Sequence, residues 1–378
     1  MTRTILLGVT ADTSLILMRG LPEFLARNGW RVHVASGPGP NNEAAAQSTA
    51  FSTHVISMAR NPHPVRDLAS LISWIRLLRR VRPDVVHVGT PKAGLLGTLA
   101  AFITRVPHRV YILRGLRYET SRGVQRRFLR AMERVTMKLA HRVVAVSPSL
   151  RALAIDDNLT RAQKITVLGA GSSNGVDLQR FRRKDHNATK RRNVRWPTRP
   201  DTPVFGFIGR LHEDKGLDLL YEAARSLHNQ GVSFRLLIVG PLESDVNYPD
   251  LFHQAGIPAE FTGNVSDPLP YLELMDVLCL PTKREGFPNV VLEAAACAIP
   301  TIATQATGVV DAIIHQQTGL LTANRDPQEF ATLMRSLATN IELRSTLGDQ
   351  AYERVHQSFG RELVWKENLA FFNHLLDS

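Results

Sequence analysis

The feature that most constrains the fold is an alternation of short apolar runs with amphipathic segments, which recurs in both halves of the chain. In the first half, strand-like runs such as TILLGVT (4–10) and PDVVHVGT (83–90) are separated by segments of helical periodicity such as DLASLISWIRLLRRVR (67–82). The same order begins again at PVFGFIGR (203–210). Strands rich in Val and Ile that alternate with helices favour a parallel sheet with helices on both faces. We therefore predict an α/β fold of two doubly wound, Rossmann-like domains in series.

A charged stretch that contains proline interrupts this alternation, and it predicts the division of the chain. The predicted parts are an N-terminal acceptor-binding domain (1–180), a basic linker (181–203), a C-terminal donor-binding domain (204–358) and a helix that packs back on the first domain (359–378). Ligands of doubly wound sheets bind beyond the carboxyl ends of the strands. The predicted site is therefore a cleft between two facing domains.

The net charge of +12 is divided unevenly along the chain. Residues 1–199 carry 34 Lys and Arg against 11 Asp and Glu, whereas residues 200–378 carry 12 against 23. No helix-turn-helix, zinc-finger or RNP-like pattern accompanies the basic half, so we expect no nucleic-acid partner. An anionic membrane surface attracts the same charge without those patterns.

Two further observations bear on where the chain acts. No apolar run reaches the roughly 18–20 residues of a membrane span, and no secretion signal is recognisable at the start. Cys279 and Cys297 lie inside apolar runs, as buried cysteines of a reducing compartment do. We predict a cytoplasmic protein that binds peripherally to the inner face of the cell membrane.

The second half contains residues suited to a diphosphate. In FGFIGRLHEDKG, a strand ends at Gly209 and is followed by Arg210 and then by Lys215 before a helix. An Arg and a Lys across one turn can converge on a diphosphate, because Arg offers a forked contact and Lys a point charge. On their own, the two residues are equally compatible with solvated loop cations.

A pair of carboxylates follows the next apolar strand. Glu285 stands at the end of VLCLPTKRE, and Glu293 lies inside the helix that begins near Pro288. The first turn of that helix offers free N–H groups to a phosphate. Carboxylates accept hydrogen bonds from hydroxyl groups, as a sugar ring and a ribose require. Together with Arg210 and Lys215, the pair indicates a nucleotide-diphosphate sugar as ligand.

The chain resembles the retaining glycosyltransferases of family 4, which have the GT-B fold. The most specific segments are GRLHEDKG, FTGNVSDPLPYLELMDVLCLPTKREGFPNVVLEAAACAIP and GVVDAIIHQQTGLL, while PDVVHVGTPKAGLLGTLAA and GSSNGVDLQRF resemble the branch that builds capsule, exopolysaccharide and lipid-linked glycans. The resemblance implies that Arg210 and Lys215 bind the donor diphosphate, that Glu293 holds the ribose and that Glu285 contacts the donor sugar. It also implies donor contacts from Gly209, Asn264, Val265, Gly286, Phe287, Pro288 and Asn289, with neither a metal nor a cofactor.

Two positions depart from the family pattern. Ala298 replaces a common glycine, a change of packing. Arg114 stands where many relatives have a histidine near the transferred sugar. Because Arg keeps its proton at physiological pH, Arg114 cannot act as a general base, and we expect it to act electrostatically among the catalytic residues. Front-face retaining transfer, which the resemblance implies, uses the leaving phosphate to assist the acceptor.

The acceptor side is expected in the first half, at the ends of its strands. Asp12 is either an acceptor contact at the catalytic site or a turn-former or helix cap. Lys92 is a candidate for an acceptor phosphate, with a solvated loop lysine as the alternative. The full set of expected acceptor contacts is Thr10, Asp12, Thr90, Lys92 and Arg117. GAGSSNGVD lacks the glycine spacing of a dinucleotide loop and indicates an interdomain crossing instead.

The segment RGVQRRFLRAMERVTMKLAHR has cations at four-residue spacing, which forms one stripe on a helix. This stripe is either the solvated face of a core helix or a membrane surface. The residues predicted to face the membrane are Arg122, Arg126, Arg127, Arg130, Arg134 and Lys138.

These observations predict a metal-independent, retaining glycosyltransferase of cell-surface polysaccharide synthesis. The donor is expected to be a UDP-sugar, and the acceptor a polyprenyl-diphosphate-linked or other membrane-associated glycan. Two alternatives remain open: a nucleotide-sugar 2-epimerase of the same fold, for which the first half supplies few carboxylates besides Asp12 and Glu119, and a transferase that acts on a small natural product.

Overall fold

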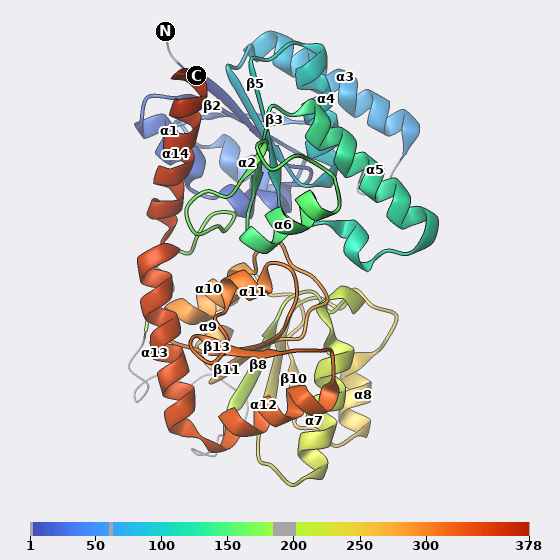
Figure 1. Ribbon diagram of the computed structural model, residues 1–378, viewed down its shortest axis with the longest axis vertical. Helices are drawn as coiled ribbons and strands as arrows, with labels where there is room; N and C mark the ends of the chain where they lie inside the picture. Colours follow the sequence, from blue (N-terminus) through green and yellow to red (C-terminus); the bar gives the residue numbers. More distant parts are fainter. Residues whose placement is uncertain (1–2, 60–62, 184–201, 378) are drawn as a thin grey trace. The chain divides into compact units, whose positions relative to one another are not determined.

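The computed structural model describes residues 3–59, 63–183 and 202–377, and the chain divides into two compact units (Figure 1). Unit 1 comprises residues 1–174 and 361–378, and unit 2 comprises residues 175–360. The first boundary precedes the predicted residue 180, because Val176 N donates to Phe359 O (2.9 Å) and Arg180 pairs with Asp267 (2.5 Å), all within unit 2. Of the predicted linker, residues 184–201 lie outside the described residues.

Within the described residues, unit 1 contains a seven-stranded parallel sheet in the order β3-β2-β1-β4-β5-β6-β7. Its strands are β1 (Thr4–Gly8), β2 (Arg31–Ser36), β3 (Ser52–Val55), β4 (Val85–Gly89), β5 (His108–Leu113), β6 (Arg142–Ala145) and β7 (Ile165–Thr166). Its helices are η1 (Asp12–Met18), α1 (Leu21–Arg27), α2 (Pro40–Ala46), α3 (Pro64–Val81), α4 (Pro91–Ile103), η2 (Arg117–Thr120), α5 (Gly123–Leu139), α6 (Pro148–Asp156) and α14 (Arg361–Asp377).

Both faces of this sheet are buried, which accounts for the continuous apolar runs of its central strands. Alternate residues of β1 face opposite layers: Ile5 and Leu7 belong to one core cluster, and Leu6 belongs to the other. The C-terminal helix α14 completes the first of these clusters. Its Trp365 Nε1 donates to Asn174 Oδ1 (2.8 Å), and its Phe372 packs edge-on against Trp30.

Unit 2 repeats this architecture, with a six-stranded parallel sheet among its described residues in the order β10-β9-β8-β11-β12-β13. Its strands are β8 (Val204–Ile208), β9 (Arg235–Val239), β10 (Ala259–Phe261), β11 (Val277–Leu280), β12 (Thr301–Thr304) and β13 (Gly319–Thr322). Its helices are η3 (Glu213–Lys215), α7 (Leu217–Asn229), α8 (Tyr248–Gln254), α9 (Leu269–Leu272), α10 (Asn289–Ala296), α11 (Val309–Ala312), α12 (Pro327–Thr339) and α13 (Ile341–Ser358). Cys279 and Cys297 are both buried and free, and burial raises the pKa of the Cys279 thiol.

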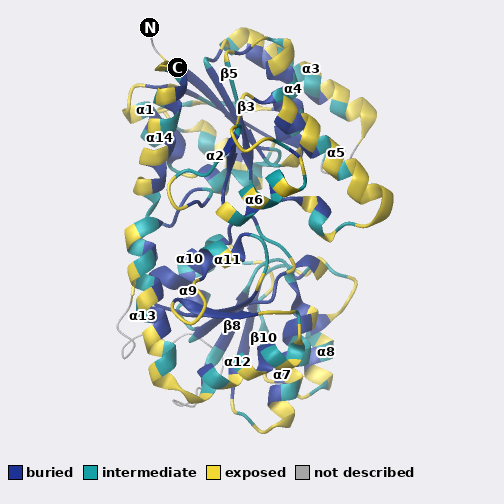
Figure 2. Cartoon of the chain, viewed as in Figure 1, coloured by how far each residue is buried: buried dark blue, intermediate teal, exposed yellow. Residues whose placement is uncertain are grey.

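The strand orders confirm the predicted doubly wound α/β fold of each unit. In both sheets the first strand of the unit lies beside the fourth, β1 beside β4 and β8 beside β11, and the order reverses there. In Figure 2 the central strands of both sheets are dark blue, whereas the outer faces of many surrounding helices are yellow. Loops at the carboxyl ends of such neighbouring strands diverge and leave room for a ligand.

Unit 1 contains a buried acid that makes its stability depend on pH. The Tyr111 hydroxyl donates to Glu133 Oε2 (2.9 Å), and burial raises the pKa of Glu133 to about 7. In the unfolded chain this carboxyl ionises at its ordinary pKa, so folding binds a proton between the two values. The stability contributed by this bound proton is complete below the pKa of Glu133 in the unfolded chain, and it is lost as pH rises through the pKa of Glu133 in the folded chain.

Replacement of Glu133 by Gln is therefore expected to remove a pH-dependent loss of stability. Gln keeps an oxygen for the Tyr111 hydroxyl but cannot ionise. Relative to the variant, the wild type should lose up to about 3 kcal/mol between about pH 5 and about pH 8, at 1.36 kcal/mol per pKa unit. Urea titrations at both pH values measure the difference. Glu43→Gln, at an exposed position of α2, is the control, and equal pH dependence of E133Q and wild type would contradict the assignment.

Candidate active site

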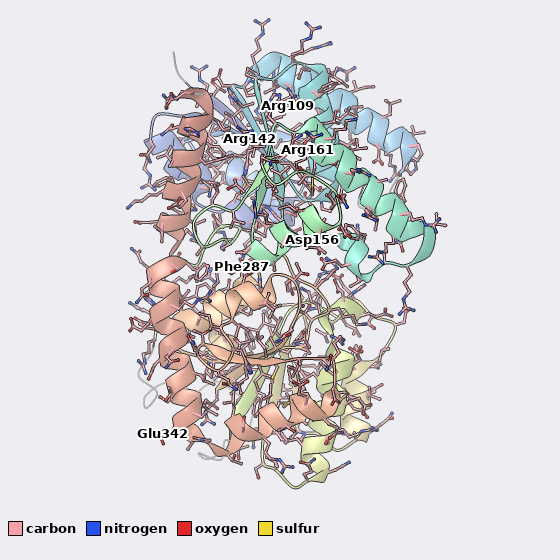
Figure 3. All side chains as sticks on the ribbon, viewed as in Figure 1. Arg109, Arg142, Asp156, Arg161, Phe287 and Glu342 are labelled. Carbon is pink, nitrogen blue, oxygen red and sulfur yellow. The ribbon has the colours of Figure 1, made fainter. Side chains whose placement is uncertain are left out.

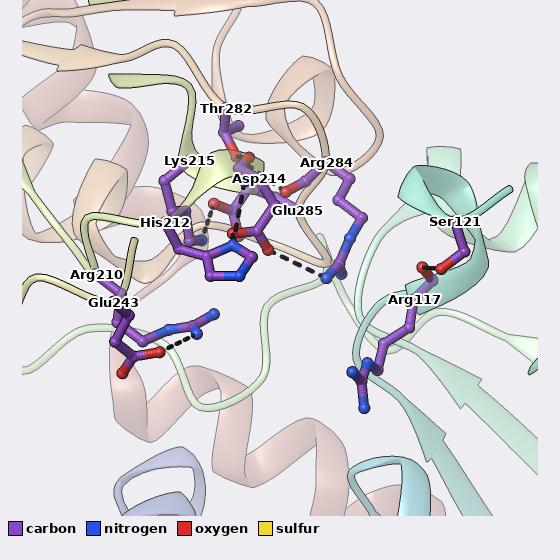
Figure 4. A network of polar contacts seen from close by, with 10 residues as sticks. All are labelled: Arg117, Ser121, Arg210, His212, Asp214, Lys215, Glu243, Thr282, Arg284 and Glu285. Atoms are coloured by element: carbon purple, nitrogen blue, oxygen red, sulfur yellow. Dashed lines mark hydrogen bonds and ion pairs between the residues drawn. The ribbon is translucent and has the colours of Figure 1, made fainter. Parts of the chain in front are cut away.

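In unit 2 an ion pair spans the point where the strand order reverses (Figure 4). Lys215 ends η3, in the loop that follows β8, and Glu285 stands in the loop that follows β11. Lys215 Nζ lies 2.6 Å from Glu285 Oε1, and the two side chains are only 20% and 15% exposed. Partial burial strengthens this pair and keeps both groups oriented. The structure thus brings together two of the residues predicted for the donor diphosphate and sugar.

Arg210 is held by a second carboxylate. Gly209 N donates to Val239 O (2.9 Å) at the end of β8, and Arg210 Nη1 lies 2.9 Å from Glu243 Oε2, beyond the end of β9. This pair is more exposed than the pair of Lys215 and Glu285, so its net stabilisation is small. Arg210 is therefore oriented at the carboxyl edge of the sheet. Its ion pair with Glu243 is weak enough for a ligand to replace Glu243 as the partner of Arg210.

Asp214, which the sequence did not single out, joins the two loops. Its buried carboxylate pairs with Arg284 (3.2 Å) and His212 (2.7 Å), and its carbonyl accepts from Lys283 N (2.8 Å) and from the Thr282 hydroxyl (3.0 Å). Burial alone would raise the pKa of Asp214. The charges of Lys215 and Arg284 and the hydrogen bond from His212 outweigh it, so the pKa is lowered. Asp214 therefore stays ionised and fixes the loop that carries Lys215.

The turn after Lys215 depends on a glycine. Gly216 has a φ of +73°, in the left-handed region, and a Cβ placed there would collide with Pro281 O. Gly231 offers a matched comparison, because its φ of +72° is the same while nothing lies within 4 Å of the equivalent Cβ position. A side chain at Gly231 would introduce backbone strain alone, whereas a side chain at Gly216 would add a collision with the neighbouring loop.

Gly216→Ala is expected to destabilise unit 2 and to weaken nucleotide binding. Strain in the left-handed region costs about 1–3 kcal/mol, and the collision displaces either Lys215 or the loop after β11. Gly231→Ala carries only the strain. Urea unfolding and UDP titration of both variants measure the contrast. Equal losses of stability, with UDP affinity unchanged in G216A, would show that the loop tolerates a side chain there.

The segment that links Glu285 to α10 is packed closely. Glu285 N donates to Thr307 O (3.1 Å), and the Phe287 ring lies 5.3 Å from that of Phe359. Pro288 is the N-cap residue of α10, and its side chain makes no capping hydrogen bond. The Oδ1 atom of Asn289, its first residue, is buried and has no hydrogen-bond partner among the described residues. The predicted donor contacts Gly286, Phe287 and Pro288 are buried, and the first turn of α10 retains hydrogen-bonding capacity.

The remaining predicted donor residues are Glu293, Asn264 and Val265. Glu293 lies within α10 and is partly buried. Asn264 and Val265 follow Gly263, whose carbonyl accepts from Gly240 N (3.0 Å) near the end of β10. Asn264 is exposed and Val265 partly buried. All three positions belong to segments at the carboxyl side of the unit 2 sheet.

In unit 1, two predicted residues meet at the corresponding reversal of strand order. The hydroxyl groups of Thr10, after β1, and Thr90, after β4, lie 2.8 Å apart. Thr10 N donates to Thr90 Oγ1 (2.9 Å), and Ala93 N donates to Thr10 Oγ1 (3.0 Å). These bonds fix the first turn of α4 against the end of β1.

Asp12 and Lys92 have structural partners. Asp12 Oδ2 accepts from the backbone N (3.3 Å) and the side-chain Nδ2 (3.1 Å) of Asn41, in the first turn of α2. Lys92 is buried, and its ammonium lies 2.8 Å from Asp67 of α3. Asp12 thus contacts the first turn of α2, and the choice between an acceptor contact and a turn-former or helix cap stays a prediction. The structure excludes a solvated Lys92.

Arg114 follows β5 and lies over Gly89. Its Nη1 donates to Leu17 O (3.3 Å), while its buried Nε has no hydrogen-bond partner among the described residues. Burial lowers the pKa of Arg114 to about 10, so the guanidinium is charged at neutral pH. Burial and the charge of Arg114 lower the pKa of His87 to about 3. Arg117, in η2, is exposed.

The cations predicted for a membrane surface are all exposed on α5 or at its N-cap: Arg122, Arg126, Arg127, Arg130, Arg134 and Lys138. The same helix exposes Val124 (81%), Phe128 (50%) and Val135 (48%), at spacings of four and seven residues. Apolar side chains at these spacings form a second stripe beside the cations. Arg130 also donates to Asp157 O (2.5 Å), so it is tied to the body of unit 1.

Comparison with known proteins decides the family. A model described as Glycosyltransferase Family 4 matches residues 18–180, and one described as Glycosyl transferases group 1 matches residues 202–340. A capsular polysaccharide biosynthesis glycosyltransferase, CapM of Staphylococcus aureus, is 36% identical over 97% of this chain and 96% of its own length. The chain belongs to glycosyltransferase family 4. The enzyme is thus a glycosyltransferase, as the sequence predicted.

Other relatives of this glycosyltransferase agree in fold. An α-1,3-galactosyltransferase of Escherichia coli, named for UDP-Gal and GlcNAc-diphosphoundecaprenol, is 26% identical over 73% of this chain and 72% of its own length. Sucrose-phosphate synthase of Thermosynechococcus elongatus superimposes with a TM-score of 0.82 at 19% identity, covering 99% of each chain. Anabaena HepE in complex with UDP-glucose gives 0.75 at 20% identity, covering 98% of this chain and 99% of its own. The fold is GT-B.

Two searches of the described part of the chain address membranes and metals. None of its helices combines the length and apolar character needed to cross a bilayer. Within residues 3–59, 63–183 and 202–377, no group of three or more His, Cys, Asp and Glu side chains is arranged as a metal site.

Proposed function

We propose that this glycosyltransferase moves a sugar from a UDP-sugar to a polyprenyl-diphosphate-linked glycan, with retention of anomeric configuration, in cell-surface polysaccharide synthesis. The observation that carries the proposal is the ion pair of Lys215 and Glu285 at the reversal of strand order in unit 2. A cation of this kind suits a diphosphate, and the carboxylate beside it suits a sugar hydroxyl. The name of the E. coli relative specifies a UDP-sugar donor and a diphosphoundecaprenol-linked acceptor, and this supports the choice of substrates.

In this proposal the donor diphosphate is bound by Arg210, Lys215 and the first turn of α10. The negative charge on the leaving diphosphate grows as the glycosidic bond breaks, so fixed cations and backbone N–H groups stabilise the transition state more than the ground state. Glu285 accepts a hydrogen bond from the donor sugar, and Glu293 accepts hydrogen bonds from the ribose. The cations supply the neutralisation that a metal ion supplies elsewhere, so the transfer is proposed to be metal-independent.

The chemical step breaks the bond between the anomeric carbon and the β-phosphate oxygen, and forms a bond from that carbon to the acceptor oxygen. The acceptor proton passes to the leaving phosphate on the same face of the sugar. No side chain of the protein needs to accept a proton, which suits Arg114, whose guanidinium is charged at neutral pH.

The membrane part of the proposal rests on α5. Its cations and its exposed apolar stripe together resemble the face of a helix that lies in the lipid headgroup region. A polyprenyl carrier stays in the bilayer, so an enzyme that acts on it gains from binding an anionic leaflet. We place the enzyme at the inner face of the cell membrane, with the basic half of the chain carrying the acceptor side.

A thermal-shift screen against nucleotide diphosphates and their sugars tests the donor assignment. A ligand that binds only the folded state stabilises it by about 2.7 kcal/mol at 100 times its dissociation constant. UDP and one UDP-sugar should raise the melting temperature of the wild type and leave that of Lys215→Ala nearly unchanged. Stabilisation by another nucleotide class, or an equal shift in the variant, would refute the UDP-sugar assignment at this site.

A further inference from the structure

A hollow of about 500 Å³ lies on unit 1, at the edge of the sheet opposite to Thr10, Thr90 and Arg114. The ends of α4 and α5 and the starts of β5, β6 and β7 surround it. Because the strands are parallel, their first residues share one edge and their last residues share the other. The hollow is therefore separate from the carboxyl-edge residues expected to meet the acceptor.

The polar side chains of this hollow are overwhelmingly cationic. No Asp or Glu is among its lining residues, and its charged or titratable members are Arg109, Lys138, His141, Arg142, Arg161 and Lys164. Figure 3 labels three of these arginines on their separate segments. Among the described residues, no carboxylate forms an ion pair with any of the five Lys and Arg side chains. Elsewhere in unit 1, by contrast, the buried Lys92 is paired with Asp67.

Backbone carbonyls orient two of these cations, Arg109 and Lys164, without neutralising them. Arg109 Nε donates to Leu139 O (2.9 Å), and its Nη1 donates to Val106 O (3.0 Å). Lys164 Nζ donates to Lys138 O (2.9 Å), at the end of α5. Arg109 Nη2 lies 2.6 Å from His141 Nε2, and in this contact the imidazole accepts. The site is thus preorganised, and it carries an excess of positive charge.

The crowding of these groups has an energetic cost. Burial, followed by the charges of Arg109 and Arg142, lowers the pKa of Lys164. Burial and the charge of Arg109 also lower the pKa of His141. Like charges held together in a partly desolvated hollow repel one another, and a bound anion relieves this repulsion.

We propose that this hollow binds a phosphate-bearing ligand of at least two negative charges, at a site separate from the transfer reaction. Forked arginines and an ammonium group around one cavity are the donors that phosphate groups take in proteins. The ligand is either the headgroup of an anionic lipid or a free phosphorylated molecule. Phe102, 50% exposed beneath the Arg109 guanidinium, gives the rim an apolar surface on which the glycerol end of a lipid can lie.

The test uses the double variant Arg142→Ser/Arg161→Ser, because within the described residues neither guanidinium group forms a hydrogen bond or an ion pair. Inorganic pyrophosphate is the soluble probe, titrated calorimetrically into a full-length parent in which Arg210→Ala and Lys215→Ala remove the donor cations. A second titration uses the chain without those two changes, saturated with UDP. Arg122→Ser/Arg126→Ser removes the same charge from the other end of α5 and is the matched control.

The pocket variant is expected to bind pyrophosphate at least tenfold more weakly than its parent, a change of about 1.4 kcal/mol, with the control unchanged. Phosphatidylcholine vesicles with and without cardiolipin, whose headgroup carries two phosphates, then identify the source. Weaker binding of the pocket variant to the anionic vesicles assigns a lipid headgroup, and unchanged vesicle binding assigns a free ligand. If neither probe distinguishes the pocket variant from its parent, the proposal is wrong. If the wild-type enzyme transfers no sugar from any UDP-sugar while the pyrophosphate result holds, only the proposed function is overturned.

Discussion

Lys215→Ala is expected to lower kcat/KM for glycosyl transfer at least about a hundredfold, as does the loss of a single preorganised group that stabilises a developing charge. Two effects add in this variant. The diphosphate loses a cation, and Glu285, which lies 2.6 Å from Lys215 Nζ, is left as an unpaired carboxylate that repels it. Steady-state rates of sugar release from the donor, with acceptor present, measure the loss.

Substitutions of the two carboxylates predicted to bind the donor test the same assignment. Glu285→Gln and Glu293→Gln should also reduce transfer by orders of magnitude, because each carboxylate is assigned to a hydroxyl of the donor. Lys366→Ala, at an exposed position of α14 in unit 1, is the matched control and should leave the rate unchanged. Full activity of Lys215→Ala would refute the assignment of Lys215 to the diphosphate.

A charge swap on α5 is expected to abolish binding to anionic vesicles. The positions to change are Arg126, Arg127 and Arg134, and Arg130 is left in place because it bonds to Asp157 O and its substitution would disturb unit 1. Each cation near an anionic surface contributes about 1 kcal/mol, so three Arg→Glu changes should weaken binding more than about a hundredfold. Co-sedimentation at low salt measures the partition between vesicle and solution.

The control for this experiment keeps the charge. Arg→Lys at the same three positions should bind nearly as well as the wild type, because an interfacial contact of this kind depends on charge more than on fork geometry. A higher salt concentration should weaken vesicle binding by both the wild type and the Arg→Lys variant. Absence of wild-type binding at low salt, or equal binding by the charge-swapped variant, would refute the proposal that α5 binds an anionic membrane.

The strand ends of the site were predictable from the sequence, and their counter-ions were not. Glycine, arginine and carboxylate residues directly after apolar strands indicated Arg210 and Glu285, since parallel strands bring their carboxyl ends to one edge. Glu243 pairs with Arg210 from a loop 33 residues away, and Asp67 pairs with Lys92 from a separate helix. Such ion pairs depend on how distant segments pack together, and the periodicity and spacing of residues in the sequence do not predict this packing.

Asp214 shows a signal that could have been recognised. It lies between Arg210 and Lys215 in GRLHEDKG, beside His212. An acid inside a cationic loop is a candidate to hold that loop, and here it is buried between Arg284 and His212. Asp12 shows the converse: a polar residue after a strand is compatible with an acceptor contact, a turn or a cap, and its contact with Asn41 could not be predicted from the sequence.

The most direct measurement is transfer itself. The purified enzyme is incubated with candidate UDP-sugars and a short-chain polyprenyl-diphosphate-linked N-acetylhexosamine, and the lipid product is examined by mass spectrometry and NMR. We predict one added sugar per UDP released, with the anomeric configuration of the donor retained in the new linkage and transfer by Lys215→Ala at least about a hundredfold slower. Inversion of that configuration, or an epimerised nucleotide sugar formed without acceptor, would contradict this prediction.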